Sequence, residues 1–289
     1  MKHAIQKADI LIEALPYIQA FNGKMVLIKL GGSAMKKESV MLGVLEDIVF
    51  LKAVGIMPIL VHGGGPHIND ELAKAQKKSS FIKGHRVTDR ETLDIVVKVT
   101  TEISRLIATA IEKYGGKATC LCDLETPAVE AEKLIFNNAG PEEDLGFVGK
   151  VSRIDTKTFR EICDSGSIPV IAPIAKGRDE KVFNINADSV ASIVAQSLIV
   201  EKLVLLSDTH GIMTEPGNED SFASTLHEKE IESLIQKKVI TEGMLPKVNA
   251  CISVLLKGVK KAHIIDGRIP HSLLLEIFTV KGVGTQVLV

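Results

Sequence analysis

The sequence lacks an excess of positive charge. Its 35 lysine and arginine residues nearly balance 36 aspartate and glutamate residues over 289 positions. A protein that holds nucleic acid by the phosphate backbone needs a surplus of basic residues. Nucleic acid is therefore not expected as a partner.

The sequence also lacks a long apolar run. Its longest nearly apolar stretch, 190–200, is interrupted by Ser192, Gln196 and Ser197, whereas a helix needs about 20 apolar residues to cross a bilayer. Residues 2–13 carry several charges where a secretory signal has an unbroken apolar segment. We expect no membrane span and a cytoplasmic location.

Cysteine is scarce, with four residues in the chain. Cys120 and Cys122 lie two apart on an expected strand, while Cys163 and Cys251 stand alone. No CxxC or Cys/His spacing suits zinc. The four thiols are expected to be small core residues.

What the sequence does contain is apolar residues, 45% of the chain, enough for a substantial core. Short apolar runs alternate with helical periodicity, which is typical of a parallel sheet covered on both faces. We predict an open three-layer αβα sandwich with a mostly parallel sheet. Its expected strands are 25–30, 57–61, 118–122, 168–172, 202–207 and 262–266.

Helices are expected at 40–53 and after Pro66, and a capping box formed by Thr88 and Glu91 predicts a helix of about 25 residues. Segment 127–153 is rich in turn residues and predicts hairpins that project from the main sheet. A soft boundary near 173–182 divides the chain into two lobes. The expected parts are 1–22, 23–177 and 178–289.

The first of these parts predicts an amphipathic helix outside the βαβ core, bent by Pro16. Its apolar residues fall on one helical side: Ile10, Leu11, Ala14, Leu15 and Ile18. We expect this helix to serve oligomerisation and regulation.

Two glycine-rich loops follow the first two expected strands. Residues 29–33 read KLGGS and residues 62–66 read HGGGP. Open α/β sheets bind ligands where strands end, and glycine lets backbone N–H groups approach an anion. Two such loops side by side suit a phosphate and a carboxylate, although glycine also simply permits tight turns.

Other chemistries that use glycine-rich loops are disfavoured. A Walker A loop and a GxGxxG fingerprint are both absent. HGGG also forms the oxyanion loop of some hydrolases, but these need a GxSxG nucleophile elbow. The nearest candidate, 31–35, ends in Met35.

Five strings in order resemble the amino acid kinase family, and within it the members that phosphorylate N-acetyl-L-glutamate. The similarity runs from about Lys24 to the C-terminus. The strings are IKLGGS at 28–33, VHGGGP at 61–66, GHRVTD at 84–89, FNINAD at 183–188 and GMLPKVNA at 243–250.

The resemblance implies transfer of the γ-phosphoryl group of ATP to the side-chain carboxylate of N-acetyl-L-glutamate, a step of arginine biosynthesis. It implies Mg²⁺ bound through ATP, with no metal ligand from protein side chains. A carboxylate is already ionised near neutral pH and needs no general base. Catalysis should therefore consist of positioning and electrostatic stabilisation.

Site residues are carried over by the same resemblance. Lys29 and Lys247 would contact the transferring phosphoryl group, Asp188 would hold both lysines, and Gly32 and Gly64 would donate backbone N–H groups. The expected acceptor residues are Gly64, Gly65, Arg86 and Asn184. The expected nucleotide residues are Asp208, Gly211, Met213 and Thr241.

The two ends of the chain resemble the arginine-inhibited members of the family, in which N-terminal helices join dimers into a homohexamer. The arginine site implied is Tyr17, Lys202, His263, Glu276, Gly282 and Gly284. Whether a PII signalling protein binds stays open. Two alternative functions also stay open. One is a related kinase that acts on carbamate, aspartate, glutamate or a nucleotide monophosphate, and the other is an arginine sensor without catalytic activity.

Overall fold

The computed structural model describes eight stretches of the chain. They are 1–32, 34–122, 124–125, 127–136, 144–215, 217–241, 243–280 and 282–289. Ser33 of the first glycine loop and residues 137–143 of the expected hairpin segment lie outside them. No helix in the described stretches is both long and apolar enough to cross a membrane.

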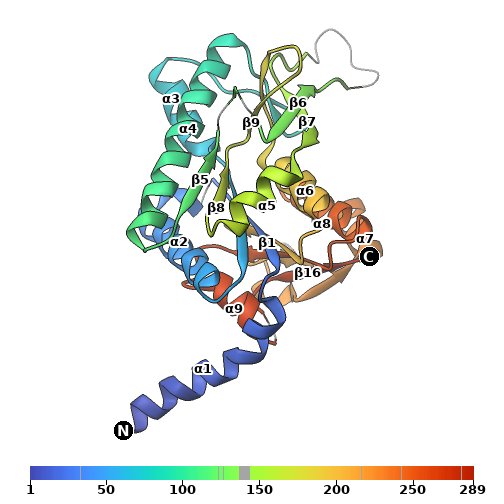
Figure 1. Cartoon of the computed structure of the whole chain (residues 1–289). Helices are drawn as coiled ribbons and strands as arrows, with labels where there is room; N and C mark the ends of the chain where they lie inside the picture. Colours follow the sequence, from blue (N-terminus) through green and yellow to red (C-terminus); the bar gives the residue numbers. More distant parts are fainter. Residues whose placement is uncertain are drawn as a thin grey trace.

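An eight-stranded sheet crosses the molecule, in the order β14-β16-β15-β11-β1-β2-β8-β5 (Figure 1). Only β15 and β16 pair antiparallel within it. The six expected strands are all present: β1 Met25–Leu30, β2 Met57–His62, β5 Ala118–Leu121, β8 Ile168–Ile171, β11 Lys202–Ser207 and β15 Lys261–Asp266. The others are β14 Thr225–His227 and β16 Thr285–Leu288.

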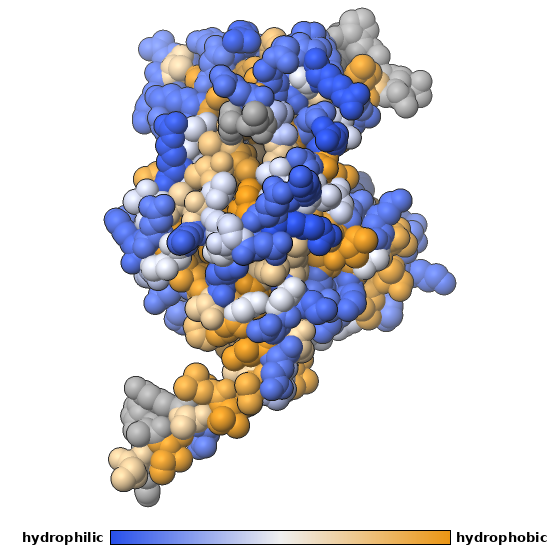
Figure 2. Space-filling view, in the orientation of Figure 1, coloured by the Kyte–Doolittle hydropathy of each residue, from blue (hydrophilic) through white to orange (hydrophobic). Residues whose placement is uncertain are grey.

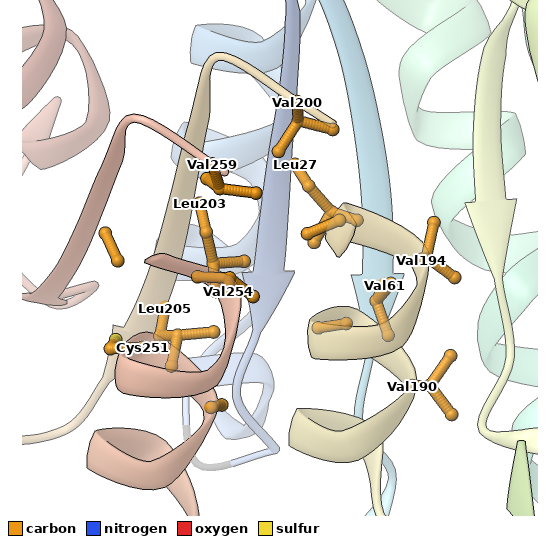
Figure 3. Close-up of a cluster of buried hydrophobic side chains, with 14 of the residues drawn as sticks. Leu27, Val61, Val190, Val194, Val200, Leu203, Leu205, Cys251, Val254 and Val259 are labelled. Carbon is orange, nitrogen blue, oxygen red and sulfur yellow. The ribbon is translucent and has the colours of Figure 1, made fainter. Parts of the chain in front are cut away.

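Helices cover both faces of this sheet, which confirms the expected three-layer α/β sandwich. One face carries α2 Glu38–Ala53, α3 Gly65–Lys74, α4 Arg90–Lys113 and α9 Ser272–Phe278. The other carries α5 Thr156–Asp164, α6 Ala187–Leu198, α7 Glu228–Gln236 and α8 Leu245–Leu256 (Figure 1). Figure 3 shows the core beneath α6 and α8, to which Leu27 of β1 and Val190 and Val194 of α6 all contribute.

The alternation of side chains along β1 decides where its lysine points. Val26, Ile28 and Leu30 belong to the core beneath α2 and α4, whereas Leu27 belongs to the core beneath α6 and α8. Successive side chains of a strand face opposite sides of the sheet. Lys29 therefore shares the side of Leu27, toward α6 and α8.

The expected capping box of α4 is wrong by one residue. The carboxylate of Asp89 accepts the backbone N–H of Thr92 at 2.8 Å, so Asp89 is the N-cap. Thr88 is unavailable because its buried hydroxyl donates to the carbonyl of Arg86 at 2.7 Å. The expected length was right, since α4 has 24 residues.

The hairpin prediction for 127–153 is confirmed in the described residues. β6 Val129–Lys133 and β7 Gly149–Ile154 pair antiparallel in a separate four-stranded sheet. Its other strands, β9 Ile174–Lys176 and β10 Val182–Asn184, are joined by the polar loop 177–181. Two small hairpins stand apart: β3 Phe81–Ile82 with β4 His85–Arg86, and β12 Ile212–Met213 with β13 Phe222–Ala223. Single 3₁₀ turns lie at Ala34–Lys36 and Glu219–Ser221.

Helix α1, Lys2–Phe21, projects away from the sandwich (Figure 1). Phe21 is buried against the body, whereas Ile10, Leu11 and Ile12 are each more than 60% exposed. Figure 2 shows apolar side chains along the projecting length. Pro16 lies inside the helix, and the bend there stays a prediction.

Candidate active site

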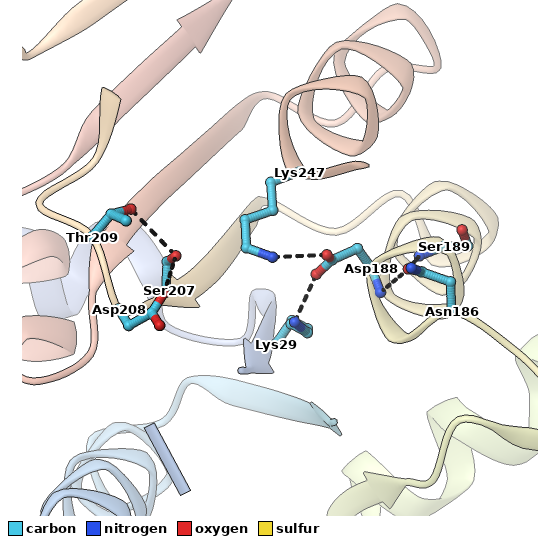
Figure 4. A network of polar contacts seen from close by, with 8 residues as sticks. All are labelled: Lys29, Asn186, Asp188, Ser189, Ser207, Asp208, Thr209 and Lys247. Atoms are coloured by element: carbon cyan, nitrogen blue, oxygen red, sulfur yellow. Dashed lines mark hydrogen bonds and ion pairs between the residues drawn. The ribbon is translucent and has the colours of Figure 1, made fainter. Parts of the chain in front are cut away.

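One carboxylate joins the two lysines that the sequence singled out. Asp188 in the first turn of α6 lies 2.8 Å from the Nζ of Lys29 on β1 and 2.9 Å from the Nζ of Lys247 on α8 (Figure 4). The three side chains are at most 15% exposed. Tertiary packing thus gathers one anion and two cations from three separate elements.

The start of α6 fixes this carboxylate in place. Asn186 is the N-cap, and its side-chain oxygen accepts the backbone N–H groups of Asp188 at 2.8 Å and Ser189 at 3.2 Å. A negative charge in the first turn of a helix is also stabilised by the helix dipole. The sequence NINAD therefore serves both as a helix cap and as a mount for Asp188.

The electrostatics keep Asp188 ionised. Burial raises the pKa of Asp188, but the charges and hydrogen bonds of Lys29 and Lys247 outweigh burial and hold that pKa at about 2. Burial, aided by the charge of Lys247, lowers the pKa of Lys29, and Asp188 opposes this shift. A carboxylate so acidic is ionised at neutral pH and is a poor proton acceptor.

The two glycine loops touch beside this triad. The N–H of Gly63 donates to the carbonyl of Leu30 at 2.9 Å. A Cβ on Gly32 would lie 2.6 Å from the Cδ of Pro66, and one on Gly31 would lie 2.7 Å from the carbonyl oxygen of Leu206. A side chain at Gly32 would push the two loops apart and one at Gly31 would collide with β11, so close approach requires glycine at both positions.

A cavity of about 380 Å³ lies on one side of the loops, and all four expected acceptor residues line it. Gly64 and Gly65 begin α3, where free N–H groups favour an anion. The guanidinium of Arg86 lies over the ring of Phe81 at 4.8 Å and donates to the carbonyl of Gly65 at 3.4 Å. This space is called the acceptor cavity below.

A second cavity of about 380 Å³ lies on the other side, and all four expected nucleotide residues line it. Asp208 and Gly211 belong to the loop after β11, and Met213 to β12. Lys29 and Gly32 line both cavities, while Lys247 lines this one. The two spaces, the acceptor cavity and this nucleotide cavity, therefore meet at Lys29 and Gly32.

A third cavity of about 780 Å³ brings together all six residues expected at the arginine site. Glu276 of α9 lies 2.7 Å from the Nζ of Lys202 and 3.1 Å from the Nε2 of His263. Burial, with the nearby lysine charges, lowers the pKa of His263 to about 2, so the imidazole is neutral. Tyr17 of α1 lines the same space. We refer to it as the α9 cavity.

Sequence reasoning missed a charged contact behind the nucleotide loop. Arg268 donates two hydrogen bonds to the buried carboxylate of Asp266, from Nε at 2.9 Å and from Nη2 at 2.8 Å. His210 lies 3.5 Å from the same carboxylate, and the N–H of Gly267 donates to Ser207. The available signal was Asp266 at the carboxyl end of a buried strand, beside Ser207 of β11.

No group of three or more His, Cys, Asp or Glu residues in the described part of the chain could hold a metal ion. Cys163 and Cys251 are buried core thiols, as expected, while Cys120 and Cys122 are half-buried at the edge strand β5. Burial raises the pKa of Cys251 above the ordinary range of a thiol. Such a buried thiol is inert rather than nucleophilic.

The fold and the lysine-carboxylate site define a kinase of the amino acid kinase type. The sequence model of the amino acid kinase family matches residues 24–266, and the chain belongs to this family. It is accordingly a phosphotransferase that uses ATP, with a carboxyl group as acceptor.

Relatives that match over the full length narrow the class further. The acetylglutamate kinase of Heliobacterium modesticaldum is 46% identical over 100% of both chains. That of Moorella thermoacetica is 47% identical over 98% of this chain and 97% of its own. The resemblance to the acetylglutamate branch of the family is thereby confirmed.

Solved structures of similar fold include an enzyme with a longer chain. N-acetylglutamate synthase from Neisseria gonorrhoeae, complexed with coenzyme A and N-acetyl-glutamate, superposes with a TM-score of 0.86 at 25% identity. The match covers 97% of this chain but 63% of the synthase. A complex of the same synthase with coenzyme A and L-arginine gives a TM-score of 0.82 at 24% identity over 97% of this chain and 65% of the synthase.

Proposed function

We propose that this enzyme is an acetylglutamate kinase, which transfers the γ-phosphoryl group of ATP to the side-chain carboxylate of N-acetyl-L-glutamate. The products are N-acetyl-L-glutamyl 5-phosphate and ADP, in arginine biosynthesis. One observation carries the proposal: the acceptor cavity and the nucleotide cavity meet at Lys29 and Gly32, beside the Lys29–Asp188–Lys247 triad.

The chemistry follows from the charges at this meeting point. The attacking carboxylate and the triphosphate are both anions, so their repulsion is the main barrier to contact. Lys29 and Lys247 offset that repulsion and stabilise the negative charge of the transferring group. Asp188 does not accept a proton, because its pKa is about 2; its role is to hold both ammonium groups in position.

Backbone groups and Mg²⁺ complete the proposed site. The N–H groups of Gly32 and Gly64 donate to the transferring phosphoryl group from the two loops. Mg²⁺ binds through the phosphates of ATP, since the ion keeps several of its waters and favours phosphate oxygens. It supplies further neutralisation of the phosphate charge.

Recognition of the acceptor rests on Arg86 and Asn184. A planar guanidinium binds a carboxylate with two parallel hydrogen bonds, which suits the carboxylate that does not react. The side-chain N–H of Asn184 donates to the hydroxyl of Thr88 at 3.1 Å, which fixes the amide at the edge of the acceptor cavity. Asn184 then contacts the polar end of the acceptor that Arg86 does not bind.

The test is ATP turnover with N-acetyl-L-glutamate, L-glutamate and carbamate in parallel, with hydroxylamine to trap any acyl phosphate. We expect acyl phosphate from N-acetyl-L-glutamate alone. Lys247→Ala should lose most of this product, whereas Lys229→Ala, at an exposed position of α7, is the matched control. Product from another acceptor, or full activity of Lys247→Ala, would refute the proposal.

We further propose that L-arginine inhibits the enzyme by binding in the α9 cavity. Glu276 is a carboxylate suited to the guanidinium of the ligand, and Tyr17 offers an aromatic face. L-arginine is also bound in a structure of the Neisseria synthase, a protein that shares this fold over part of its length, which supports the choice of ligand. The ligand would favour an arrangement of the enzyme that is less competent for transfer.

Arginine inhibition is tested by activity and melting temperature at millimolar L-arginine. Wild type should lose activity and gain thermal stability, because a ligand stabilises the state that it binds. Tyr17→Ala should keep its fold and basal activity but require more arginine for inhibition. Unchanged activity and melting temperature of the wild type would refute this site.

Assembly and organisation complete the proposal. Helix α1 joins dimers into a homohexamer through its exposed apolar side. The part 23–177 acts as the acceptor lobe and the part 178–289 as the nucleotide lobe. The enzyme works in the cytoplasm. Sedimentation of Leu11→Asp tests the hexamer, and smaller particles than the wild type are expected. Pull-down with a PII signalling protein tests whether that partner binds.

A further inference from the structure

A fully buried histidine begins the second glycine loop. His62 is the last residue of β2 and is 0% exposed. Leu60, two residues earlier, belongs to the core beneath α2 and α4, and side chains two apart on a strand share one side of the sheet. His62 therefore faces α4, on the opposite side of the sheet from Lys29.

Both ring nitrogens of His62 have a partner. Nδ1 lies 2.8 Å from the carbonyl oxygen of Gly63, and Nε2 lies 2.7 Å from the hydroxyl of Ser104 on α4. Burial lowers the pKa of His62 to about 4, against the weaker opposing effect of the Gly63 carbonyl, so the ring is neutral at pH 7 and has one N–H. A carbonyl oxygen can only accept, so that N–H is on Nδ1, and the hydroxyl of Ser104 donates to Nε2.

The hydrogen bond from His62 fixes the direction of the peptide group between Gly63 and Gly64. In a planar trans peptide group the C=O of one residue and the N–H of the next point in opposite directions. The Gly63 carbonyl points toward His62 and α4, so the N–H of Gly64 points away from them, toward the side of the sheet where Lys29 lies. Gly63 and Gly64 both line the acceptor cavity, and no acceptor in the described part of the chain receives this N–H.

The same peptide group depends on His62 for its orientation. Both flanking residues are glycine, whose backbone adopts conformations closed to other residues, so rotation of the peptide group meets little steric resistance. The neighbouring bonds, from Gly63 N–H to Leu30 and from Ile68 N–H to the Gly64 carbonyl, belong to the peptide groups on either side. With the His62 donor removed, the Gly63 carbonyl is free to turn toward the cavity, where its oxygen repels an anion.

We propose that His62 is a positioning residue for phosphoryl transfer, which aims the N–H of Gly64 at the transferring group, and that Ser104 holds the ring in the tautomer this requires. The inference rests on the proposed function, in which the N–H of Gly64 donates to the transferring phosphoryl group. A donor aimed in advance at the place where charge develops lowers the barrier, because nothing has to reorganise during the reaction. His62 acts through Gly63 and Gly64, since the ring itself is fully buried.

Two substitutions separate the two hydrogen bonds of the ring. The amide nitrogen of asparagine is as many bonds from its Cα as Nδ1 of histidine is, and that of glutamine as many as Nε2. His62→Asn therefore still donates to Gly63, whereas His62→Gln keeps a polar group only beside Ser104. We expect kcat to fall about 100-fold in His62→Gln but less than about fivefold in His62→Asn, with KM for both substrates within about threefold of wild type.

A purely structural role of His62 predicts a different order. Asparagine is smaller than glutamine and leaves more of the imidazole space empty, so His62→Asn should unfold at a lower urea concentration although it is the more active variant. Ile107→Val, three residues from Ser104 on α4 and buried, is the matched control. It should also unfold at a lower urea concentration than wild type but keep the wild-type kcat. Equal kcat in the two His62 variants, or a lower value in His62→Asn, would overturn the proposal.

Crystal structures of both variants test the direction of the peptide group without any turnover. The Gly63 carbonyl should still point toward residue 62 in His62→Asn and should turn toward the acceptor cavity in His62→Gln. A carbonyl that keeps its wild-type direction in His62→Gln would also overturn the proposal. Wild type that forms no acyl phosphate from N-acetyl-L-glutamate would instead refute the proposed function, which separates the two failures.

Discussion

Replacing Asp188 by asparagine removes the charge that two buried lysines share. Lowering the pKa of Asp188 from 3.8 to about 2 corresponds to about 2 to 3 kcal/mol of favourable interaction in the folded state. Removing one partner of a buried ion pair costs about 3 to 5 kcal/mol, since the other charge is left unpaired. We therefore expect Asp188→Asn to lose about 3 kcal/mol of unfolding free energy, or about 5 °C in melting temperature.

The same change should alter catalysis in a way that identifies its cause. With Asp188 gone, burial and the charge of Lys247 lower the pKa of Lys29 further, and of the two carboxylates that oppose this shift Asp208 remains. The alkaline limb of the pH–rate profile should then move to lower pH, and kcat at pH 7.5 should fall about 100-fold or more. Urea unfolding and initial rates from pH 6 to 9 measure both effects.

The matched control is Asp89→Asn. Contacts with Lys77 and Thr92 lower the pKa of Asp89 to about 2 as well, and burial opposes this shift only weakly. The side chain of Asp89 is nevertheless 61% exposed. Asparagine caps a helix as well as aspartate does, and exposed ion pairs contribute little, so a loss below about 0.5 kcal/mol is expected. If Asp188→Asn matched this control and its pH–rate profile did not move, the reasoning about the triad would be refuted.

The wild type should also lose, in acid, the stabilisation of the fold that Asp188 provides. The folded pKa lies below the unfolded value, so the stabilisation is complete above about pH 4 and disappears as pH falls toward 2. Gly32→Ala should lower the free energy of unfolding by about 1 to 3 kcal/mol and kcat about 100-fold, because the added Cβ meets Pro66. Its control is Gly43→Ala in α2, where the added Cβ meets open space. This control should gain about 0.5 to 1 kcal/mol of unfolding free energy and keep full activity. Burial lowers the pKa of His62 to about 4, so the free energy of unfolding should fall as pH drops from 6.5 to 4. His62→Gln lacks this titration. Between pH 7.5 and 5 it should therefore lose about 2 kcal/mol less unfolding free energy than the wild type.

Each of these outcomes is open to contradiction. Gly32→Ala with wild-type kcat would show that the two glycine loops need not touch. An acid loss in His62→Gln equal to that of the wild type would mean that protonation of His62 does not limit stability. Urea titrations at the stated pH values, with initial rates at pH 7.5, supply the measurements.

The sheet could be predicted because its strands are buried on both faces. β1 and β11 are continuous apolar runs, interrupted by Lys29 in the first case, and their bounds match the prediction at both ends. β14 and β16 escaped prediction since they are short and only partly buried. The start of α4 was misassigned by one residue because two polar residues compete as caps, and tertiary contacts of Thr88 decide between them.

The site could be anticipated only in part. Period-two alternation shows that Lys29 faces one side of the sheet, but it cannot show that Asp188 and Lys247, 59 residues apart, meet there. That meeting depends on how α6 and α8 pack, which comes from the whole core. The Asp266–Arg268 contact was missed although Asp266 ends a buried strand, because that position alone does not show that Arg268, two residues on, folds back to bind it.

The sharing of one carboxylate by two lysines has a consequence for evolution. Loss of Asp188 alone leaves two lysine ammonium groups together in a buried place, whereas loss of one lysine leaves the other paired with Asp188. Residues in one network do not contribute additively, so the cost of each substitution depends on which came before it. A lineage that abandons the reaction therefore loses least stability when a lysine is replaced first. Asp188 should not be the first of the three positions to change.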